Sequence, residues 1–74
     1  MQIVEVEWLD ICAHHGWDSK AHNRAGVSNC KSTGYLVHNG KNHITIAQSL
    51  SDNENVADKL SIPRNCVKAI KRLK

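Results

Sequence analysis

Cysteine and histidine are the side chains of this protein best suited to metal binding, and most of them gather in one segment. The set is Cys12, His14, His15, His22 and Cys30. Zinc favours cysteine and histidine ligands in a tetrahedral arrangement. The paired spacing that usually supplies them, such as C-x2-C, is absent from the sequence. We therefore expect solvated loop histidines and no metal site.

A thiol beside an imidazole could also act as a nucleophile. Residues 12 and 14 share a face if the chain is extended there, which would bring Cys12 next to His14. Such catalysis also needs a third group that holds the imidazole, and the sequence offers no arrangement of that kind. The glycines are scattered and form neither a dinucleotide fingerprint nor a phosphate-binding loop. The sequence therefore predicts neither enzyme activity nor a cofactor.

The cysteine count bears on the cellular compartment. An odd number of cysteines without a signal-peptide pattern argues against a disulfide framework. We expect reduced thiols, with Cys12 and Cys66 buried as small apolar residues. No apolar run approaches the ~18 residues of a membrane span. These features predict a cytoplasmic protein without membrane contact.

Charge is distributed unevenly between the two ends of the chain. Residues 1–18 contain acids but no lysine or arginine, whereas residues 64–74 contain bases but no acid. The basic cluster of this tail is Lys68, Lys71, Arg72 and Lys74. One interpretation is that the tail binds the phosphates of a nucleic acid. The other is that the first and last strands pair, so that Glu5 and Glu7 face tail lysines and partly neutralise them.

The N-terminal segment, residues 3–11, alternates apolar and acidic residues. Val4, Val6 and Trp8 fall on one parity with glutamates between them, which is the period of a half-buried strand. A helix also fits the apolar spacing, but the β-branched content favours the strand. Residues 13–32 show no sustained period. We expect a long irregular loop there, of the kind in which binding often takes place.

An Asn39-Gly40 dipeptide between two strand-like runs is the clearest local signal in the sequence. This dipeptide favours a type I′ hairpin turn. With that turn, Tyr35 lies opposite Ile44, and Val37 shares their buried face. The solvent side of the predicted hairpin carries His38, Lys41 and His43.

The only proline follows an alternating apolar run at residues 56–62, which we expect to be a strand. Residues 51–55 before it are predicted to form a polar turn. Pro63 ends the strand because it cannot donate a ladder hydrogen bond. Apolar residues then follow at three-residue spacing: Val67, Ile70 and Leu73. This spacing fits either a short helix or a 3₁₀ turn that leads into a last strand.

Short strands and turns dominate the chain. We expect residues 1–74 to form one mainly β domain, a small five-stranded antiparallel barrel with a short 3₁₀ or helical turn near the C-terminus. A domain of this size buries only about 60% of its unfolded surface. A homodimer would therefore add stability.

The segment Ile62-Pro63, a polar turn and then Val67 resembles the end of Src-homology-three-like barrels. In those barrels such a pair leads through a 3₁₀ turn into a last strand that pairs with the first. The whole chain also resembles a set of small phage and prophage proteins. The shared features are Trp8 with Asp10, Gly16-Trp17, Ser32-Thr33-Gly34-Tyr35, an Ile/Val-rich strand ending near Ala47, and Ile62-Pro63 with Cys66. This resemblance implies a mobile-element origin and a small β-barrel, but no activity.

These observations favour a non-catalytic phage or prophage protein that binds a host protein in the cytoplasm of the host cell. Inhibitors of bacterial defence and host-takeover factors act in this way. We expect the contact residues in the long loop, namely Trp17, His14, His15, His22 and Arg24. Trp17 either anchors this interface or covers the end of the barrel. The alternative is a small nucleic-acid-binding protein that uses the basic cluster of the tail, and a third hypothesis is sequestration of a small anionic signal.

Overall fold

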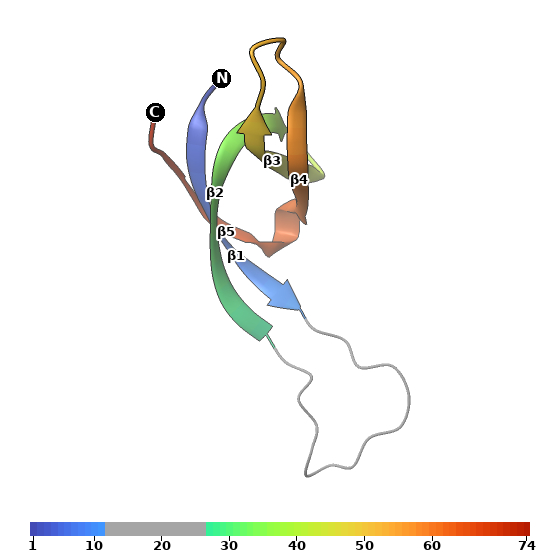
Figure 1. Cartoon of the computed structure of the whole chain (residues 1–74). Coiled ribbons are helices and arrows are strands. Elements are labelled where there is room, and N and C mark those ends of the chain that lie inside the picture. The colour runs from blue at the N-terminus through green and yellow to red at the C-terminus, as the bar shows by residue number, and fades with distance from the viewer. Residues whose placement is uncertain (12–26) are drawn as a thin grey trace, which may run out of the picture.

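The computed structural model describes residues 1–11 and 27–74 of the chain. Five strands and one 3₁₀ helix follow in order: β1 (Ile3–Ile11), β2 (Val27–Asn39), β3 (His43–Leu50), β4 (Val56–Pro63), η2 (Arg64–Cys66) and β5 (Val67–Arg72). Figure 1 shows their arrangement, with the two chain ends near each other. The prediction of a mainly β, five-stranded antiparallel fold is confirmed. Within the described residues, no helix is present that could cross a membrane.

The five strands form one sheet in the order β4-β3-β2-β1-β5, and each neighbouring pair is antiparallel. β2 pairs with β1 along its first part and with β3 along its second, and it curves through both halves of the sheet (Figure 1). The predicted pairing of the first and last strands is confirmed. The predicted barrel is not closed, however, because no ladder joins β4 to β5 in the described part of the chain.

The core is built from β-branched side chains on one face of the curled sheet. Five of them are at most 1% exposed: Val4, Val6, Ile44, Ile46 and Ile62. Such residues suit a pleated, buried surface, and their alternation along β1 places the glutamates on the other face. Half-buried residues pack around this core, namely Trp8, Leu36, Cys66 and Val67. Cys66, which was expected to be buried, is therefore only half-buried.

The loop predicted over residues 13–32 is wrong in its last part, because β2 begins at Val27. Cys30 pairs with Trp8 and Ser32 with Val6, so both lie on the core side of the sheet. These small side chains leave room for the indole ring of Trp8. Because small residues stand at these core-side positions, the start of β2 shows no apolar period. The remainder of the predicted loop falls outside the described residues.

The turn between β2 and β3 lies one position later than predicted. Asn39 still belongs to β2 and pairs with Ile44, so residues 40–42 form the turn. The Gly40 N–H donates to the His43 carbonyl oxygen at 3.0 Å and closes it. The predicted two-residue type I′ turn is therefore wrong.

A bulge in the β2–β3 ladder also changes the predicted register. The register shifts between Leu36 and His38, and Tyr35 pairs with Ala47 rather than with Ile44. Val37 is the extra residue and is 38% exposed, so the prediction that it is buried is wrong. Side-chain parity cannot reveal a bulge, because one extra residue moves the following side chains to the opposite face. The predicted solvent-side residues are nevertheless all exposed, namely His38, Lys41 and His43.

The C-terminal prediction is confirmed in most respects. Residues 51–55 form the polar turn, in which the Ser51 N–H donates to the Asn55 carbonyl oxygen at 2.8 Å. Pro63 is the last residue of β4. Of the two alternatives for the following segment, the 3₁₀ turn with a last strand is the observed one.

Candidate functional site

The partner-binding residues predicted from the sequence lie outside the described residues. They are Trp17, His14, His15, His22 and Arg24, and Cys12 lies outside as well. Cys30, the remaining member of the cysteine–histidine set, is a half-buried free thiol in β2. In residues 1–11 and 27–74, no group of three or more His, Cys, Asp or Glu side chains could hold a metal ion. The loop surface therefore stays a prediction.

An apolar groove lies where β1 passes the end of β4 and the helix η2. Its volume is about 440 Å³, and its lining residues are Trp8, Leu9, Asp10, Leu60, Ser61, Pro63 and Cys66. We call it the Trp8 groove. β1 and β4 are not neighbours in the sheet. They meet here because the sheet curls around its core. In the part of the chain that the structure describes, no strand pairs with the other edge of β4, which leaves the groove open.

Hydrogen bonds hold the polar atoms of the Trp8 groove in place. The Trp8 Nε1–H donates to Ser32 Oγ at 3.0 Å, which fixes the indole ring. The hydroxyls of Ser61 and Thr45 share a hydrogen bond of 2.8 Å. The surface offered to a ligand is therefore mainly aromatic and aliphatic, and Asp10 adds a carboxylate. Such a surface can bury apolar side chains and accept a neighbouring cation.

Sequence reasoning missed the Trp8 groove because its residues come from two segments that are distant in the chain, residues 8–10 and 60–66. Leu60 shares the parity of Ile62 in β4, yet Leu60 is 36% exposed and Ile62 is fully buried. β4 is an edge strand of the sheet. Ile62 lies at the end of β4 that leads into η2, whereas Leu60 lies two residues farther from it. A signal for this position would have required the strand order, which local periodicity does not contain.

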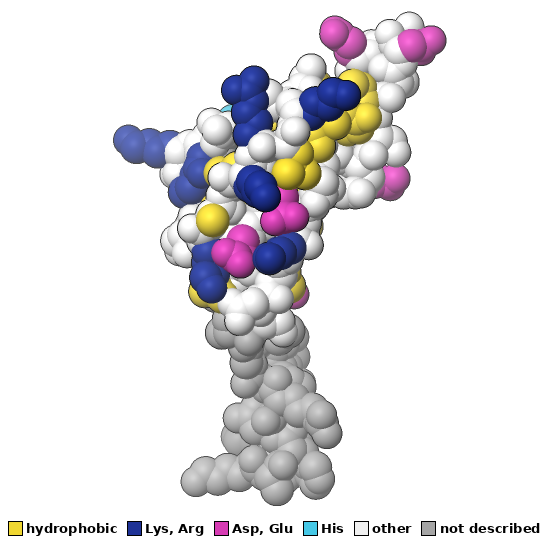
Figure 2. Space-filling model, turned by 90° about the vertical axis from the view of Figure 1, so that its left-hand side faces the viewer, with side chains coloured by type: hydrophobic (Ala, Val, Ile, Leu, Met, Phe, Trp, Pro, Cys, Tyr) yellow, Lys and Arg dark blue, Asp and Glu magenta, His cyan; other side chains and the backbone are white. Residues whose placement is uncertain are grey.

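The basic cluster of the tail lies on β5 and beyond, next to the acids of β1. Lys71 pairs with Glu5, as predicted, whereas Glu7 pairs with Ala69 on β5 and with Lys31 on β2. These five residues line a depression of about 280 Å³. Figure 2 shows such interleaving of basic and acidic side chains on one face of the molecule. Opposite charges in these cross-strand positions stabilise the sheet and reduce the local positive potential.

The four bases of the cluster do not share one face. All of them are exposed, namely Lys68, Lys71, Arg72 and Lys74. Arg72 pairs with the buried Val4 and lies on the core side, so Lys71 lies on the opposite side. Lys68 Nζ donates to Asn29 Oδ1 at 3.3 Å, on the same outer surface as Lys71. A flat phosphate-binding face made of all four side chains is therefore not formed.

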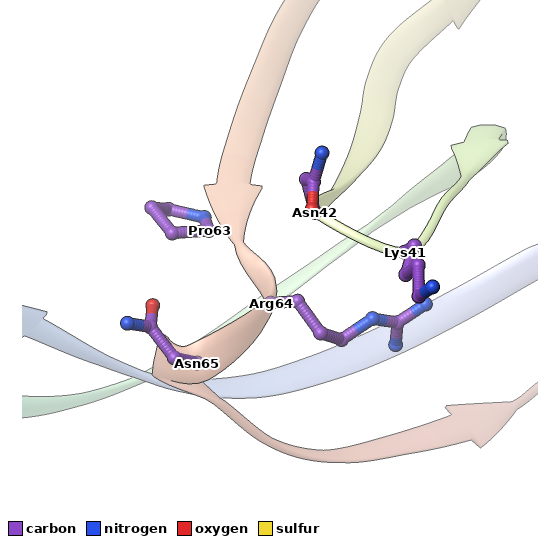
Figure 3. Close-up of a pocket in the computed structure, with 5 residues that line it drawn as sticks. All are labelled: Lys41, Asn42, Pro63, Arg64 and Asn65. Atoms are coloured by element: carbon purple, nitrogen blue, oxygen red, sulfur yellow. The ribbon is translucent and has the colours of Figure 1, made fainter.

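Arg64 joins the β2–β3 turn to the end of β4 (Figure 3). Its guanidinium donates to the Gly40 carbonyl oxygen from Nε at 3.2 Å and from Nη2 at 2.9 Å, and also to Asn39 Oδ1. Its backbone N–H donates to the Asn42 carbonyl oxygen at 2.9 Å. The open polar depression there has a volume of about 520 Å³ and is lined by Lys41, Asn42, Pro63, Arg64 and Asn65. Because Nε and Nη2 of the arginine donate to the turn, we interpret this depression as a structural junction.

We expect Arg64→Ala to lower the free energy of unfolding by about 1–2 kcal/mol, because charged hydrogen bonds to the turn are lost from a half-buried group. The measurement is urea unfolding followed by circular dichroism. Lys41→Ala, in the same depression but exposed, is the matched control and should change stability by less than about 0.5 kcal/mol. Arg64→Lys keeps the charge without the planar fork and should be intermediate. Equal stability of Arg64→Lys and the wild type would contradict this role.

In comparisons with known proteins, no family model, curated protein or solved structure matches the chain.

Proposed function

We propose that this protein is a non-catalytic binding module of a phage or prophage and that it engages a host protein through the Trp8 groove. The observation that carries the proposal is the groove itself, a concave and mainly apolar surface of about 440 Å³. Binding sites are typically concave, apolar surfaces with few polar groups. The phage origin is supported by the resemblance in sequence. The partner would place an apolar segment against Trp8 and Leu60, with a basic residue beside Asp10.

The same proposal assigns the fold to the Src-homology-three-like small barrels. Two features support this assignment. The strand order β4-β3-β2-β1-β5 is a meander in which the last strand returns to the first. The pair Ile62-Pro63 leads through η2 into that last strand. The open side between β4 and β5 departs from a closed barrel, and a fold by itself does not identify a ligand.

The proposed function is tested by capture of proteins from a host lysate on the immobilised, full-length chain. We expect Leu60→Lys to lose the captured protein, because the substitution places a charge in the Trp8 groove. Val37→Lys is the matched control, since Val37 is 38% exposed and Leu60 is 36% exposed. Val37 is not among the groove residues. The Val37→Lys variant should therefore retain the captured protein. Thermal unfolding should show that Leu60→Lys and Val37→Lys both fold.

A third variant, Trp17→Ala, tests the loop residues predicted from the sequence. Loss of capture in both Trp17→Ala and Leu60→Lys would indicate one continuous interface. Loss in Leu60→Lys alone would restrict the interface to the groove. If all three variants capture the same proteins as the wild type, in equal amounts, the proposed function is wrong.

The nucleic-acid alternative has less support, because the basic side chains of the tail lie on different faces of the sheet and Lys71 pairs with Glu5. A titration with labelled DNA and RNA at low and moderate salt tests it. Binding through phosphates weakens steeply as salt rises. Such binding, abolished by charge reversal at Lys68, Lys71 and Arg72, would favour the alternative over the groove.

A further inference from the structure

The outer edge of β5 carries no ladder in the described part of the chain, because β5 is the last strand of the sheet. The hydrogen bonds near the chain ends show which groups this edge presents. The Ile3 carbonyl oxygen accepts from the Leu73 N–H at 2.8 Å, and the Ile3 N–H donates to the Lys74 carbonyl oxygen at 2.8 Å. On the other side of β1, the Gln2 carbonyl oxygen accepts from the Leu36 N–H at 2.8 Å. Odd-numbered residues of β1 therefore bond to β5, and even-numbered ones to β2.

This alternation extends along β5. Glu5 pairs with Lys71, so the backbone groups of Lys71 point toward β1. The N–H and C=O groups of the neighbouring residues, Ile70 and Arg72, consequently point outward from the sheet. The edge thus offers an N–H and a C=O at two positions, which is the spacing that an added strand requires.

Ile70 and Lys71, which lie next to each other in β5, face opposite sides of the sheet. Ile70 pairs with the buried Val6 and lies on the core side, yet it is 38% exposed, because β5 is the edge strand among the described residues. Lys71 lies on the outer side, together with Lys68. A strand added here would therefore contact Ile70 and the Arg72 guanidinium on the core side and ammonium groups on the outer side.

β1 shows what kind of strand pairs with β5. It places Val6 opposite Ile70 on the core side and Glu5 opposite Lys71 on the outer side. The Glu5–Val6 step of β1 thus matches the Ile70–Lys71 step of β5, and Val4 lies opposite Arg72. A strand with the same pattern on the free edge would reproduce these contacts from the other side.

The other free edge of the sheet is less suited to an added strand. Asp58 in β4 has φ 57°, in the left-handed region, and its acidic side chain sits within this strand. A residue in that conformation interrupts a regular edge, and charged edge residues discourage strand addition. β5 contains no residue with positive φ.

We propose that the free edge of β5 binds an extended segment of a partner protein in which acidic and apolar residues alternate. The segment pairs with the outward groups of Ile70 and Arg72. Its carboxylates lie beside Lys68 and Lys71, and its apolar side chains cover Ile70 in the opening between β5 and β4. The inference rests on the proposed function only for the source of the segment, which would be a host protein.

A β-strand and a nucleic acid make different demands on this edge. To bind a nucleic acid, basic side chains of the protein must converge on one face, whereas Arg72 and Lys71 lie on opposite faces. An added strand places its own side chains alternately on both faces, and it also satisfies the unpaired backbone groups. The observations therefore favour a peptide.

The experiment uses the full-length protein and a labelled peptide that copies residues 2–9, QIVEVEWL, with blocked ends. We expect the peptide to bind and to slow hydrogen exchange at the amides of Ile70 and Arg72. Arg72→Pro removes one outward N–H without removing a bond to β1, and should weaken binding about tenfold or more. Arg72→Gln removes only the charge and should weaken binding by less than about fivefold. A peptide with lysine in place of both glutamates should not bind.

Several outcomes would overturn the inference. One is equal affinity of the peptide for Arg72→Pro and the wild type. Another is equal binding of the lysine peptide, and a third is protection at the Trp8 groove instead of β5. Displacement of the peptide by single-stranded DNA with a steep salt dependence would indicate a nucleic-acid surface. If Arg72→Pro does not fold, the exchange measurement on the wild type decides. No host protein enters this titration, so its failure leaves the groove proposal intact.

Discussion

Replacement of Gly34 by alanine is expected to lower the free energy of unfolding by about 3 kcal/mol, at the upper end for an overpacked site. A β-carbon at this position would lie 2.6 Å from the carbonyl oxygen of Ala47 and 3.3 Å from Cβ of Ile46. The first contact is with backbone, so it cannot be relieved by a side-chain rotation. The β2–β3 ladder would have to move apart just where Tyr35 pairs with Ala47. In a domain of this size, the midpoint of thermal unfolding should fall by more than about 10 °C.

Gly40→Ala is the matched control for this prediction. A β-carbon at Gly40 would also meet an atom at close range, but that atom belongs to the imidazole of His38. His38 is exposed and stacks on His43 with ring centroids 4.6 Å apart. Its ring can rotate into solvent, so Gly40→Ala should change stability by less than about 0.5 kcal/mol. If Gly34→Ala unfolds at the same temperature as Gly40→Ala, the Ala47 carbonyl oxygen does not lie as close to Gly34 as we describe.

The parts of the fold that could be predicted are those that local patterns determine. Alternation along residues 3–11 indicated β1, and the polar residues 51–55 indicated a turn. Pro63 marked the end of β4, because proline interrupts a ladder. The uneven charge of the two chain ends fitted either phosphate binding or pairing of the first and last strands. The resemblance to Src-homology-three-like barrels favoured the pairing, and Glu5 does pair with Lys71.

The parts that could not be predicted depend on contacts between distant segments. The start of β2 shows no period, because Cys30 and Ser32 are small where they make room for Trp8. The Asn-Gly signal gave the wrong turn because Arg64 donates to the Gly40 carbonyl oxygen and holds a longer turn in place. A residue from the far end of the chain thus overrides a local preference, and no window around the turn contains it.

The candidate sites also depend on contacts between distant segments. The Trp8 groove requires the curl of the sheet and the open edge of β4, so its residues cannot be collected by spacing along the chain. The β5 edge requires the register of β1 against β5, which assigns Lys71 and Arg72 to opposite faces. Composition indicated that the tail is positively charged, but it did not indicate on which face of the sheet each basic side chain lies. The loop residues Trp17 and Arg24 lie outside the described residues and stay a prediction.

Ile62→Ala is expected to lower the free energy of unfolding by about 2–5 kcal/mol, the usual range for removing buried aliphatic side chains. Ile62 is fully buried and pairs with Ile44, which is also fully buried. Small domains have marginal stability, so this loss is comparable to the whole stability of the fold. Urea unfolding followed by tryptophan fluorescence and circular dichroism should show a midpoint near zero urea or no folded baseline.

Leu60→Ala is the matched control, because Leu60 lies two residues earlier on the same face of β4 and is 36% exposed. Its partner in β3 is Ile46, which belongs to the core. A half-exposed leucine at an edge should cost less than about 1.5 kcal/mol when it is truncated. This difference decides how the capture experiment is interpreted. If Leu60→Ala is as destabilising as Ile62→Ala, Leu60 belongs to the core, and loss of capture in Leu60→Lys would report unfolding. If Leu60→Ala remains stable, the same loss identifies Leu60 as part of a binding surface.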